Sequence, residues 1–291
     1  MGASVVSDAW DEAAVGRLVP GLALALPRGP HRGRVGEVRA TSVGGSLELH
    51  DFRTYQPGDD LRQLDWNAVA RTDELILRVR QEEVSPRVEV VLDGSRSMAL
   101  SPRKAARARE VALLTCEVGA RQGLSPTLMV TGARPERTQG PACRTLLRRL
   151  EFDARDDLAS ALARLPPPRP CGMRVVVSDF LFEADLSALA ARLSRGAAGV
   201  FLVQVLDAED VEPSGGEGAR LVDSESGAAL EELLTEEVLA AYARRFGEHQ
   251  RQLRAAASRA RGVLLTAEAT QPLASLVMGP LRPLFVAGGG A

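Results

Sequence analysis

The stretch Arg87-Val88-Glu89-Val90-Val91-Leu92-Asp93-Gly94-Ser95-Arg96-Ser97-Met98 decides the fold. It begins as a short apolar run rich in β-branched residues, which is typical of a strand buried on both faces of a parallel sheet. A helical pattern follows from Ser101-Pro102 and stops before Gly123, and these residues are typical helix boundaries. Asp93 is therefore predicted at the carboxyl end of a strand that leads into a helix, where open α/β sheets bind their ligands.

The turn after this strand carries a set of oxygen donors. Asp93, Ser95 and Ser97 offer one carboxylate and two hydroxyls from alternate positions, and Gly94 lets the backbone bend closely. Hard oxygen donors with little total charge suit Mg²⁺. In a purely structural interpretation, the serines cap the coming helix and Asp93 accepts hydrogen bonds from turn amides. The loop alone leaves both interpretations open.

Strand and helix patterns alternate along the rest of the chain. Apolar runs predict further strands at residues 128–131, 175–180 and 200–206, and the second of these again contains an aspartate, Asp179. Helical patterns occupy residues 145–152, 157–165 and 183–195. This alternation predicts a doubly wound, mostly parallel α/β sheet, similar to a Rossmann-like fold. Residues 132–141 indicate a hairpin or an edge excursion, and residues 220–223 a strand that continues the sheet.

The longest helix is predicted over residues 236–261, with an apolar face. His249 lies on that face, and we interpret it as a packed histidine rather than a ligand. At the other end of the chain, residues 1–85 are predicted as a partly β extension that packs on the main domain, residues 86–291. Within the extension we expect a short helix before residue 20 and strands near residues 47–49 and 74–83.

Charges of alternating sign surround Trp66 in the segment from Tyr55 onwards. We interpret them as an ion-pair network that holds this segment against the main sheet, with a binding surface as the alternative. The residues concerned are Asp59, Asp60, Arg62, Asp65 and Arg71.

Composition excludes several classes of protein. The net charge of −2 gives no global basic field for nucleic acid. Lys104 is the single lysine, and the predominance of arginine, alanine, glycine and proline indicates a GC-rich, bacterial genome, so arginine clusters are interpreted as solvated helix faces. Three scattered cysteines form no disulfide framework or zinc motif. Without a signal peptide pattern or a long apolar run, a cytoplasmic location is expected.

Asp93-x-Ser95-x-Ser97 together with Asp179 resembles the metal-ion-dependent adhesion site of von Willebrand factor type A domains. The wider pattern is similar to a bacterial domain of unknown function, family fifty-eight, over roughly residues 35–265. That pattern comprises Tyr55-x-Pro57-Gly58-Asp59-Asp60-x-Arg62-x-x-Asp65-Trp66, Ala70-Arg71, Leu92-Asp93-x-Ser95-x-Ser97-Met98, Ser178-Asp179-Phe180, Leu206-Asp207, Leu221-Val222-Asp223 and Tyr242-x-x-Arg245-Phe246. The resemblance implies a type A fold in which the first and fourth strands are neighbours, which would bring Asp93 and Asp179 together beside solvent.

One position departs from the type A pattern. In the stretch Asp156-Asp157-Leu158-Ala159-Ser160-Ala161-Leu162, Asp156 stands where the resemblance leads us to expect a ligating threonine. A third carboxylate could tighten Mg²⁺ or admit Ca²⁺ or Mn²⁺, and it would make the metal less able to attract an acidic group. Alternatively, Asp156 only caps the following helix, and the site is degenerate.

The resemblance implies a non-enzymatic binding module. Mg²⁺ would be held by Asp93, Ser95 and Ser97, with Asp179 ligating directly or through water, and an open coordination position would take a carboxylate from a partner protein. Proteins similar to this one tend to be encoded beside MoxR-type AAA+ ATPases, which implies an adaptor or co-chaperone for such an ATPase. The sequence has no Walker motif, so the partner would hydrolyse ATP.

Two alternatives stay open. In an Mg²⁺-dependent aspartyl-phosphate phosphatase, Asp93 would be the nucleophile, with Lys104 and Asp179 as accessory groups. Such enzymes carry a second acid two residues after the nucleophile, whereas this chain has Ser95 there. In a degenerate scaffold, the fold survives without the metal. A nucleotide-binding role is less favoured, because no G-x-G-x-x-G motif follows a predicted strand.

Overall fold

The computed structural model describes residues 10–26, 51–54, 66, 70–71, 74–79, 87–213, 220–222, 229–231 and 235–288. It divides into two compact units: Met1–Pro27 with Pro86–Ala291, and Arg28–Ser85. The extension predicted over residues 1–85 is thus split, because its first part clusters with the main unit. The strand expected near residues 47–49 and most of the predicted ion-pair network around Trp66 lie outside the described residues.

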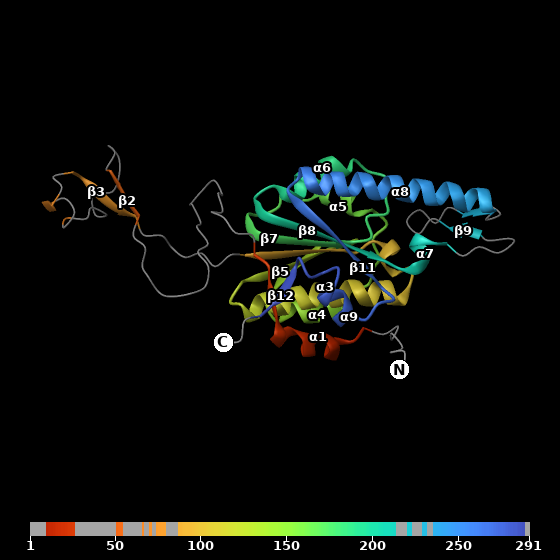
Figure 1. Ribbon diagram of the computed structural model, residues 1–291, viewed down its shortest axis with the longest axis horizontal. Helices are drawn as coiled ribbons and strands as arrows, with labels where there is room; N and C mark the ends of the chain where they lie inside the picture. Colours follow the sequence, from red (N-terminus) through yellow and green to blue (C-terminus); the bar gives the residue numbers. More distant parts are fainter. Residues whose placement is uncertain are drawn as a thin grey trace. The chain divides into compact units, whose positions relative to one another are not determined.

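A six-stranded sheet forms the centre of the main unit, in the order β11-β8-β7-β4-β5-β6 (Figure 1). All neighbouring strands are parallel except β6, which runs antiparallel to β5 at one edge. The strands are β4 (Val88–Asp93), β5 (Pro126–Thr131), β6 (Glu136–Gln139), β7 (Cys171–Ser178), β8 (Ala197–Leu206) and β11 (Gly262–Glu268). The predicted mostly parallel α/β sheet is confirmed, and so is the edge excursion at β6.

The order of the strands reverses between β4 and β7. From β4 the chain moves outward to β5 and β6, whereas β7 pairs on the other side of β4 and leads to β8. Every residue of β4 is buried, as its continuous apolar run predicts. A reversal of this kind opens a crevice at the carboxyl ends of the two strands. Asp93 is the last residue of β4, and Asp179 directly follows β7.

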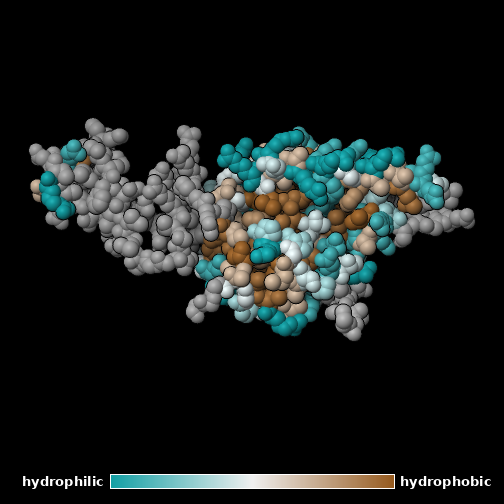
Figure 2. Space-filling view, viewed as in Figure 1, coloured by the Kyte–Doolittle hydropathy of each residue, from teal (hydrophilic) through white to brown (hydrophobic). Residues whose placement is uncertain are grey.

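Helices cover both faces of the sheet (Figure 1). One face carries α1 (Glu12–Leu18), α3 (Pro102–Arg121), α4 (Ala142–Arg149) and α9 (Leu273–Met278), and the other carries α5 (Leu158–Arg164), α6 (Leu186–Ser194) and α8 (Glu236–Arg259). Apolar residues gather between the two helix layers, while hydrophilic residues cover α6, α8 and α1 (Figure 2). Each fully buried aliphatic side chain contributes about 1.5–3 kcal/mol to this arrangement.

The predicted start of α3 is confirmed. Ser101 is its N-cap, with the side-chain oxygen accepting from the Lys104 amide at 3.2 Å, and Pro102 occupies the first turn. Before α3, the loop that follows Asp93 forms a short 3-10 helix, η3 (Arg96–Ala99). A further short helix, α7 (Ala208–Val211), follows β8.

Two short strands from distant parts of the chain pair beside α3. After α1 and the 3-10 turn η1 (Val19–Gly21), β1 (Leu22–Leu24) runs antiparallel to β12 (Phe285–Ala287). A Cβ added at Gly119 of α3 would lie 3.3 Å from Leu24 Cδ1 and 3.9 Å from Val88 Cγ2. The end of β1 and the start of β4 therefore meet at one place on α3.

The strand predicted at residues 220–223 does not continue the main sheet. β9 (Arg220–Val222) instead pairs with β10 (Ala229–Glu231) in a separate antiparallel hairpin, and β11, which the sequence did not predict, forms the edge of the main sheet. In the second unit, β2 (Asp51–Thr54) pairs antiparallel with β3 (Ile76–Val79), so the alternating pattern there does form a strand. Among the described residues, no helix has the length and apolar character to cross a bilayer.

Candidate functional site

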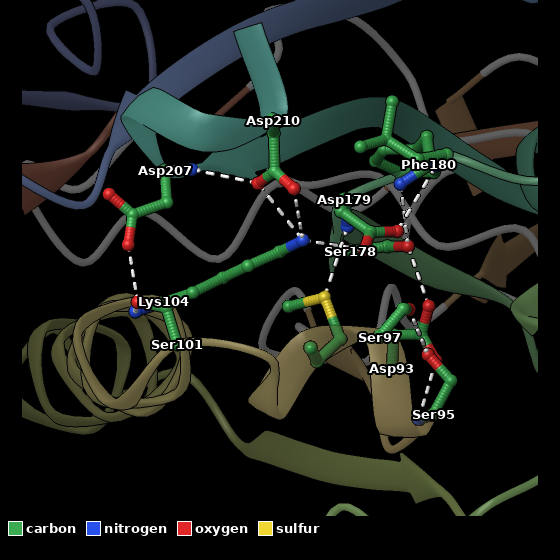
Figure 3. A network of polar contacts seen from close by, with 12 residues as sticks. Asp93, Ser95, Ser97, Ser101, Lys104, Ser178, Asp179, Phe180, Asp207 and Asp210 are labelled. Atoms are coloured by element: carbon green, nitrogen blue, oxygen red, sulfur yellow. Dashed lines mark hydrogen bonds and ion pairs between the residues drawn. The ribbon is translucent and has the colours of Figure 1, made fainter. Parts of the chain in front are cut away.

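Asp93 and Asp179 converge at the switch between β4 and β7 (Figure 3). Asp93 is the last residue of β4, and its Oδ2 accepts a hydrogen bond of 2.6 Å from Ser178 Oγ at the end of β7. Its Oδ1 accepts from the Ser95 amide at 3.0 Å. Burial, and next the negative charge of Asp179, raise the pKa of Asp93 to about 7. The two carboxyl groups therefore influence each other directly.

The predicted hydroxyl donors lie together on the loop after β4. Ser95 Oγ and Ser97 Oγ are 3.0 Å apart; Ser95 is buried and Ser97 is half-buried. Gly94 is required here, because a Cβ at this position would lie 1.8 Å from the Thr131 carbonyl oxygen of β5. The Gly94 amide also donates to Thr131 Oγ1 at 3.2 Å. The tight approach of this loop to β5 fixes where the serines lie.

Lys104 neutralises Asp179. Its ammonium lies 2.8 Å from Asp179 Oδ2 and 3.0 Å from Asp210 Oδ2 of α7, and its side chain is 1% exposed. The other oxygen of Asp179, Oδ1, accepts from the Leu181 amide at 3.1 Å. Burial alone would lower the pKa of Lys104, but the charges of Asp179 and Asp210 outweigh it and raise the pKa. The single lysine of the chain is therefore a charged part of the site.

Residues after β8 complete this polar network (Figure 3). Asp207 caps α7, and its Oδ2 accepts a short hydrogen bond from Ser101 Oγ at the start of α3. The Asp210 carboxylate accepts from the Asp207 amide at 2.8 Å and also pairs with Lys104. Neither Asp207 nor Asp210 was predicted as a site residue. Leu206-Asp207 within the family pattern was the signal that could have identified the first.

The loop after β7 has an unusual backbone. Phe180 is buried and adopts a left-handed conformation with φ of 54°, which few residues other than glycine adopt. Its amide donates to Ser178 Oγ at 3.0 Å, and its carbonyl lies 2.6 Å from His249 Nε2 of α8. His249 is half-buried, as expected of a packed histidine. Through the Phe180 carbonyl it also contacts the loop that carries Asp179.

Negative charge exceeds positive charge in this network. A buried carboxylate is costly unless it is paired with a cation, and the carboxyl-rich centre contains one ammonium. Arg103 Nε, at the surface, lies 3.7 Å from Asp207 Oδ2. The groups concerned are Asp93, Asp179, Asp207 and Asp210 against Lys104 and Arg103. A divalent cation near Asp93 would relieve this excess of negative charge.

Asp156 lies apart from this network. Its carboxylate is 49% exposed and forms an ion pair with Arg164. The helix cap that we considered for Asp156 belongs to Asp157, whose Oδ1 accepts from the Ser160 amide at 2.8 Å. That part of the prediction is wrong by one residue. Metal ligation by Asp156 remains a prediction, and it would require the Arg164 pair to open.

The expected position of the carboxylates beside solvent is wrong. Asp93 and Asp179 are each 1% exposed. The buried Met98 of η3 lies against Asp179, whose amide donates to Met98 Sδ at 3.1 Å. Within the part of the chain that the structure describes, no group of three or more His, Cys, Asp or Glu side chains could hold a metal ion. Metal binding would thus depend on Ser95 and Ser97 as well.

Sequence comparison places the chain among bacterial proteins. The family described as "Protein of unknown function DUF58" matches residues 51–252. The uncharacterized proteins Rv1480 of Mycobacterium tuberculosis and Mb1516 of Mycobacterium bovis are each 33% identical over 208 residues. The match covers 65% of this chain and 64% of each relative, so the chain spans less than two thirds of their length.

Two solved structures show a distant likeness. BatB from Bacteroides thetaiotaomicron, a conserved hypothetical protein, is 13% identical with a TM-score of 0.37, covering 67% of this chain and 95% of that one. An aerotolerance-related membrane protein from Bacteroides fragilis is 14% identical with a TM-score of 0.38, covering 69% of this chain and 100% of that one.

Proposed function

The chain belongs to the DUF58 family of proteins of unknown function, and on that premise we propose that it is a non-enzymatic, metal-dependent protein-binding module with a von Willebrand factor type A-like fold. The observation that carries the proposal is Asp93. This carboxyl group is buried next to a second carboxylate, and its pKa is raised to about 7. A divalent cation would supply the positive charge that this position lacks.

Mg²⁺ is the proposed metal. Asp93, Ser95 and Ser97 would ligate it directly, because their oxygens come from one loop and the hydroxyls already lie 3.0 Å apart. Asp179 would ligate through water, since both of its oxygens are engaged, by Lys104 and by the Leu181 amide. Mg²⁺ characteristically keeps several waters, whereas Ca²⁺ or Mn²⁺ would accept the same oxygens.

Partner binding requires the site to open. Ser97 is the half-buried donor, while Asp93, Ser95 and Met98 are buried, so η3 would have to move for a metal to reach solvent. The bound metal would supply a Lewis-acidic position for a carboxylate of a partner protein. Coupling metal entry to movement of η3 would make docking conditional on the metal.

A MoxR-type AAA+ ATPase is the proposed partner, with this protein as adaptor or co-chaperone in the cytoplasm. The proposal is supported by the resemblance to the family, because proteins with this sequence pattern tend to be encoded beside such ATPases. The ATPase would hydrolyse ATP, and this protein would bind the client protein on which the ATPase acts.

Two measurements test the proposal. Calorimetric titration with MgCl₂ should show binding to the wild type and none to Asp93→Asn, while Glu136→Gln serves as a control at an exposed ion pair. A pull-down with the MoxR-type ATPase of the same genome should succeed in Mg²⁺ and fail in EDTA. Equal capture under both conditions would remove the metal from the mechanism.

A metal-free scaffold is the second candidate, and Lys104 favours it. Its ammonium already neutralises Asp179, and the carboxylates are closed off from solvent. Under this alternative the titration shows no binding of Mg²⁺, Ca²⁺ or Mn²⁺. The Asp93→Ala variant would then capture the partner as well as the wild type does.

A further inference from the structure

A groove lies between two helices on one face of the sheet, where the start of α6 meets the second half of α8. The helices run side by side there (Figure 1), and Arg259 Nη1 of α8 donates to Ser187 Oγ of α6 at 2.8 Å. The groove has a volume of about 390 Å³, the size of a pocket that takes a small ligand or a few side chains. The proposed metal site uses none of the residues that line it.

The groove carries an excess of positive charge. Arg251 and Arg259 line it, both are exposed, and within the described part of the chain neither forms an ion pair. From His249 to Arg261 the chain has four arginines and no aspartate or glutamate, although its net charge is −2. Arginine clusters are expected to be solvated helix faces, but these two side chains line a concave surface.

One carboxylate lies in the groove, and it is already engaged. Asp185 is the N-cap of α6, and its Oδ1 accepts from the amides of Ser187 and Ala188 at 2.9 and 3.0 Å. The start of a helix carries partial positive charge, which offsets part of the charge of this carboxylate. The two guanidinium groups therefore still give the groove a positive excess.

Small apolar side chains lie between the charged groups. Ala255 is four residues from each arginine, on the same face of α8, and Ala184 and Leu186 line the groove from the α6 side. Arg251 and Arg259 are separated by about 12 Å along the helix axis. This surface fits a ligand that carries an aliphatic group between two anionic groups.

We propose that the groove binds an acidic peptide segment of a partner protein, with one carboxylate at each arginine and an aliphatic side chain over Ala255. A planar guanidinium matches a carboxylate through two parallel hydrogen bonds. In an extended peptide, 12 Å corresponds to roughly four residues, so the preferred segment has acidic residues at positions i and i+4. Two guanidinium groups are too few for nucleic acid, whose binding depends on a row of phosphate contacts.

Binding in the groove needs no metal. Ala184 follows the loop that carries Asp179, and His249 of α8 holds that loop through the Phe180 carbonyl at 2.6 Å. The groove is therefore a second surface for a partner, separate from Asp93 and independent of a cation.

Fluorescence anisotropy with the full-length chain tests the proposal. The probe is a labelled peptide, Gly-Glu-Ala-Leu-Ala-Glu-Gly, and Gly-Gln-Ala-Leu-Ala-Gln-Gly is its uncharged control. The acidic peptide should bind equally in MgCl₂ and in EDTA, and about 0.5 M salt should release it, because salt screens contacts between exposed charges. Equal binding of the uncharged peptide would overturn the proposal. So would binding that disappears in EDTA or in Asp93→Asn, because it would assign the peptide to the metal site.

Substitutions in the groove should change the affinity in opposite directions. Arg251→Gln and Arg259→Gln should each weaken binding about fivefold, the contribution of one exposed ion pair. Asp185→Asn should tighten binding, because the amide oxygen still caps α6 but the negative charge is gone. Arg134→Gln, in the loop between β5 and β6, makes the same change in net charge as the arginine variants and should bind like the wild type.

All four side chains are exposed, so these variants should fold and melt like the wild type. Unchanged affinity in both groove arginine variants, or weaker binding in Asp185→Asn, would refute the proposed contacts.

The same variants distinguish two other occupants of the groove. A short single-stranded oligonucleotide that binds more tightly than the peptide, and loses affinity in Arg251→Gln, would make the groove a nucleic-acid site. A dimer of the chain, measured by light scattering, that dissociates in Arg251→Gln would assign the groove to a second copy. Either result would overturn the proposal of an acidic partner.

Discussion

Lys104 Nζ lies 2.8 Å from Asp179 Oδ2, and this ion pair joins α3 to the loop after β7. The same ammonium reaches Asp210 on α7, so one buried side chain connects three segments around the sheet edge. Because it is the single lysine of the chain, its role can be measured without interference from other lysines.

Replacing this lysine should destabilise the fold. Lys104→Met keeps most of the side-chain volume but leaves Asp179 and Asp210 without their cation, and breaking a buried ion pair costs about 3–5 kcal/mol. Urea denaturation measures the change. The matched control, Arg164→Met, removes an exposed ion pair with Asp156 and should leave the midpoint unchanged. Equal midpoints for Lys104→Met and the wild type would mean that the buried pair contributes nothing.

Lys104 should also report opening of the site chemically. A fully buried ammonium paired with two carboxylates is poorly nucleophilic, so an amine-reactive ester should label the terminal amine much faster than Lys104. Mass spectrometry of the labelled peptides gives both rates. If Mg²⁺ moves η3, the rate at Lys104 should change on adding MgCl₂, and Asp93→Asn should abolish that change. A metal-independent rate would argue against movement of the loop.

The raised pKa of Asp93 predicts how stability depends on pH. The folded-state pKa of about 7 lies above the ordinary 3.8, so the folded protein binds more protons than the unfolded chain between these values. Stability without metal should therefore fall as pH rises from 3.8 to about 7, by roughly 4 kcal/mol at full ionisation. Denaturation in EDTA across this range measures it.

The Asp93→Asn variant is the control for that pH dependence. Its neutral amide does not ionise, so this contribution should disappear and the variant should be more stable than the wild type above about pH 7. In the wild type, Mg²⁺ should restore the lost stability at high pH, because only the ionised carboxylate ligates well. A wild type whose stability in EDTA has the same pH dependence as Asp93→Asn would contradict the assignment.

Gly94 should tolerate no side chain. Gly94→Ala would place a Cβ 1.8 Å from the Thr131 carbonyl oxygen, and separating the loop from β5 should cost about 3 kcal/mol or more. Gly16→Ala is the opposite case, because Gly16 is exposed in α1 with nothing within 4 Å of its Cβ position. It should stabilise the protein by about 0.5–1 kcal/mol. Thermal melting compares the two variants.

The sequence predicted the features that depend on local pattern. β-Branched runs identified β4 and β7, and the serine, proline and glycine boundary signals identified α3. It did not predict β1, β11 or β12, because β1 and β12 are three residues long and β11 follows the long helix with no clear break in composition. Short strands depend on their partners rather than on their own periodicity.

The site was predictable only in part for a similar reason. Asp93, Ser95 and Ser97 lie within a few residues, so their proximity follows from the loop itself. The pairing of Lys104 with Asp210 spans 106 residues and follows from where α7 sits after β8, which no local pattern specifies. Burial of Asp93, which is 1% exposed, likewise depends on how the strands and loops assemble around it. Charge and burial are properties of the assembled fold.

The approach of Leu24 and Val88 to the same glycine of α3, Gly119, has a practical consequence. Because the chain leaves the main unit just after Leu24 and returns just before Val88, the Arg28–Ser85 unit is an insertion whose two junctions start close together on α3. A short glycine–serine linker could replace the whole insertion without pulling the flanking strands apart. A foreign domain could be inserted at the same position, so the main unit could carry other binding domains in place of residues Arg28–Ser85.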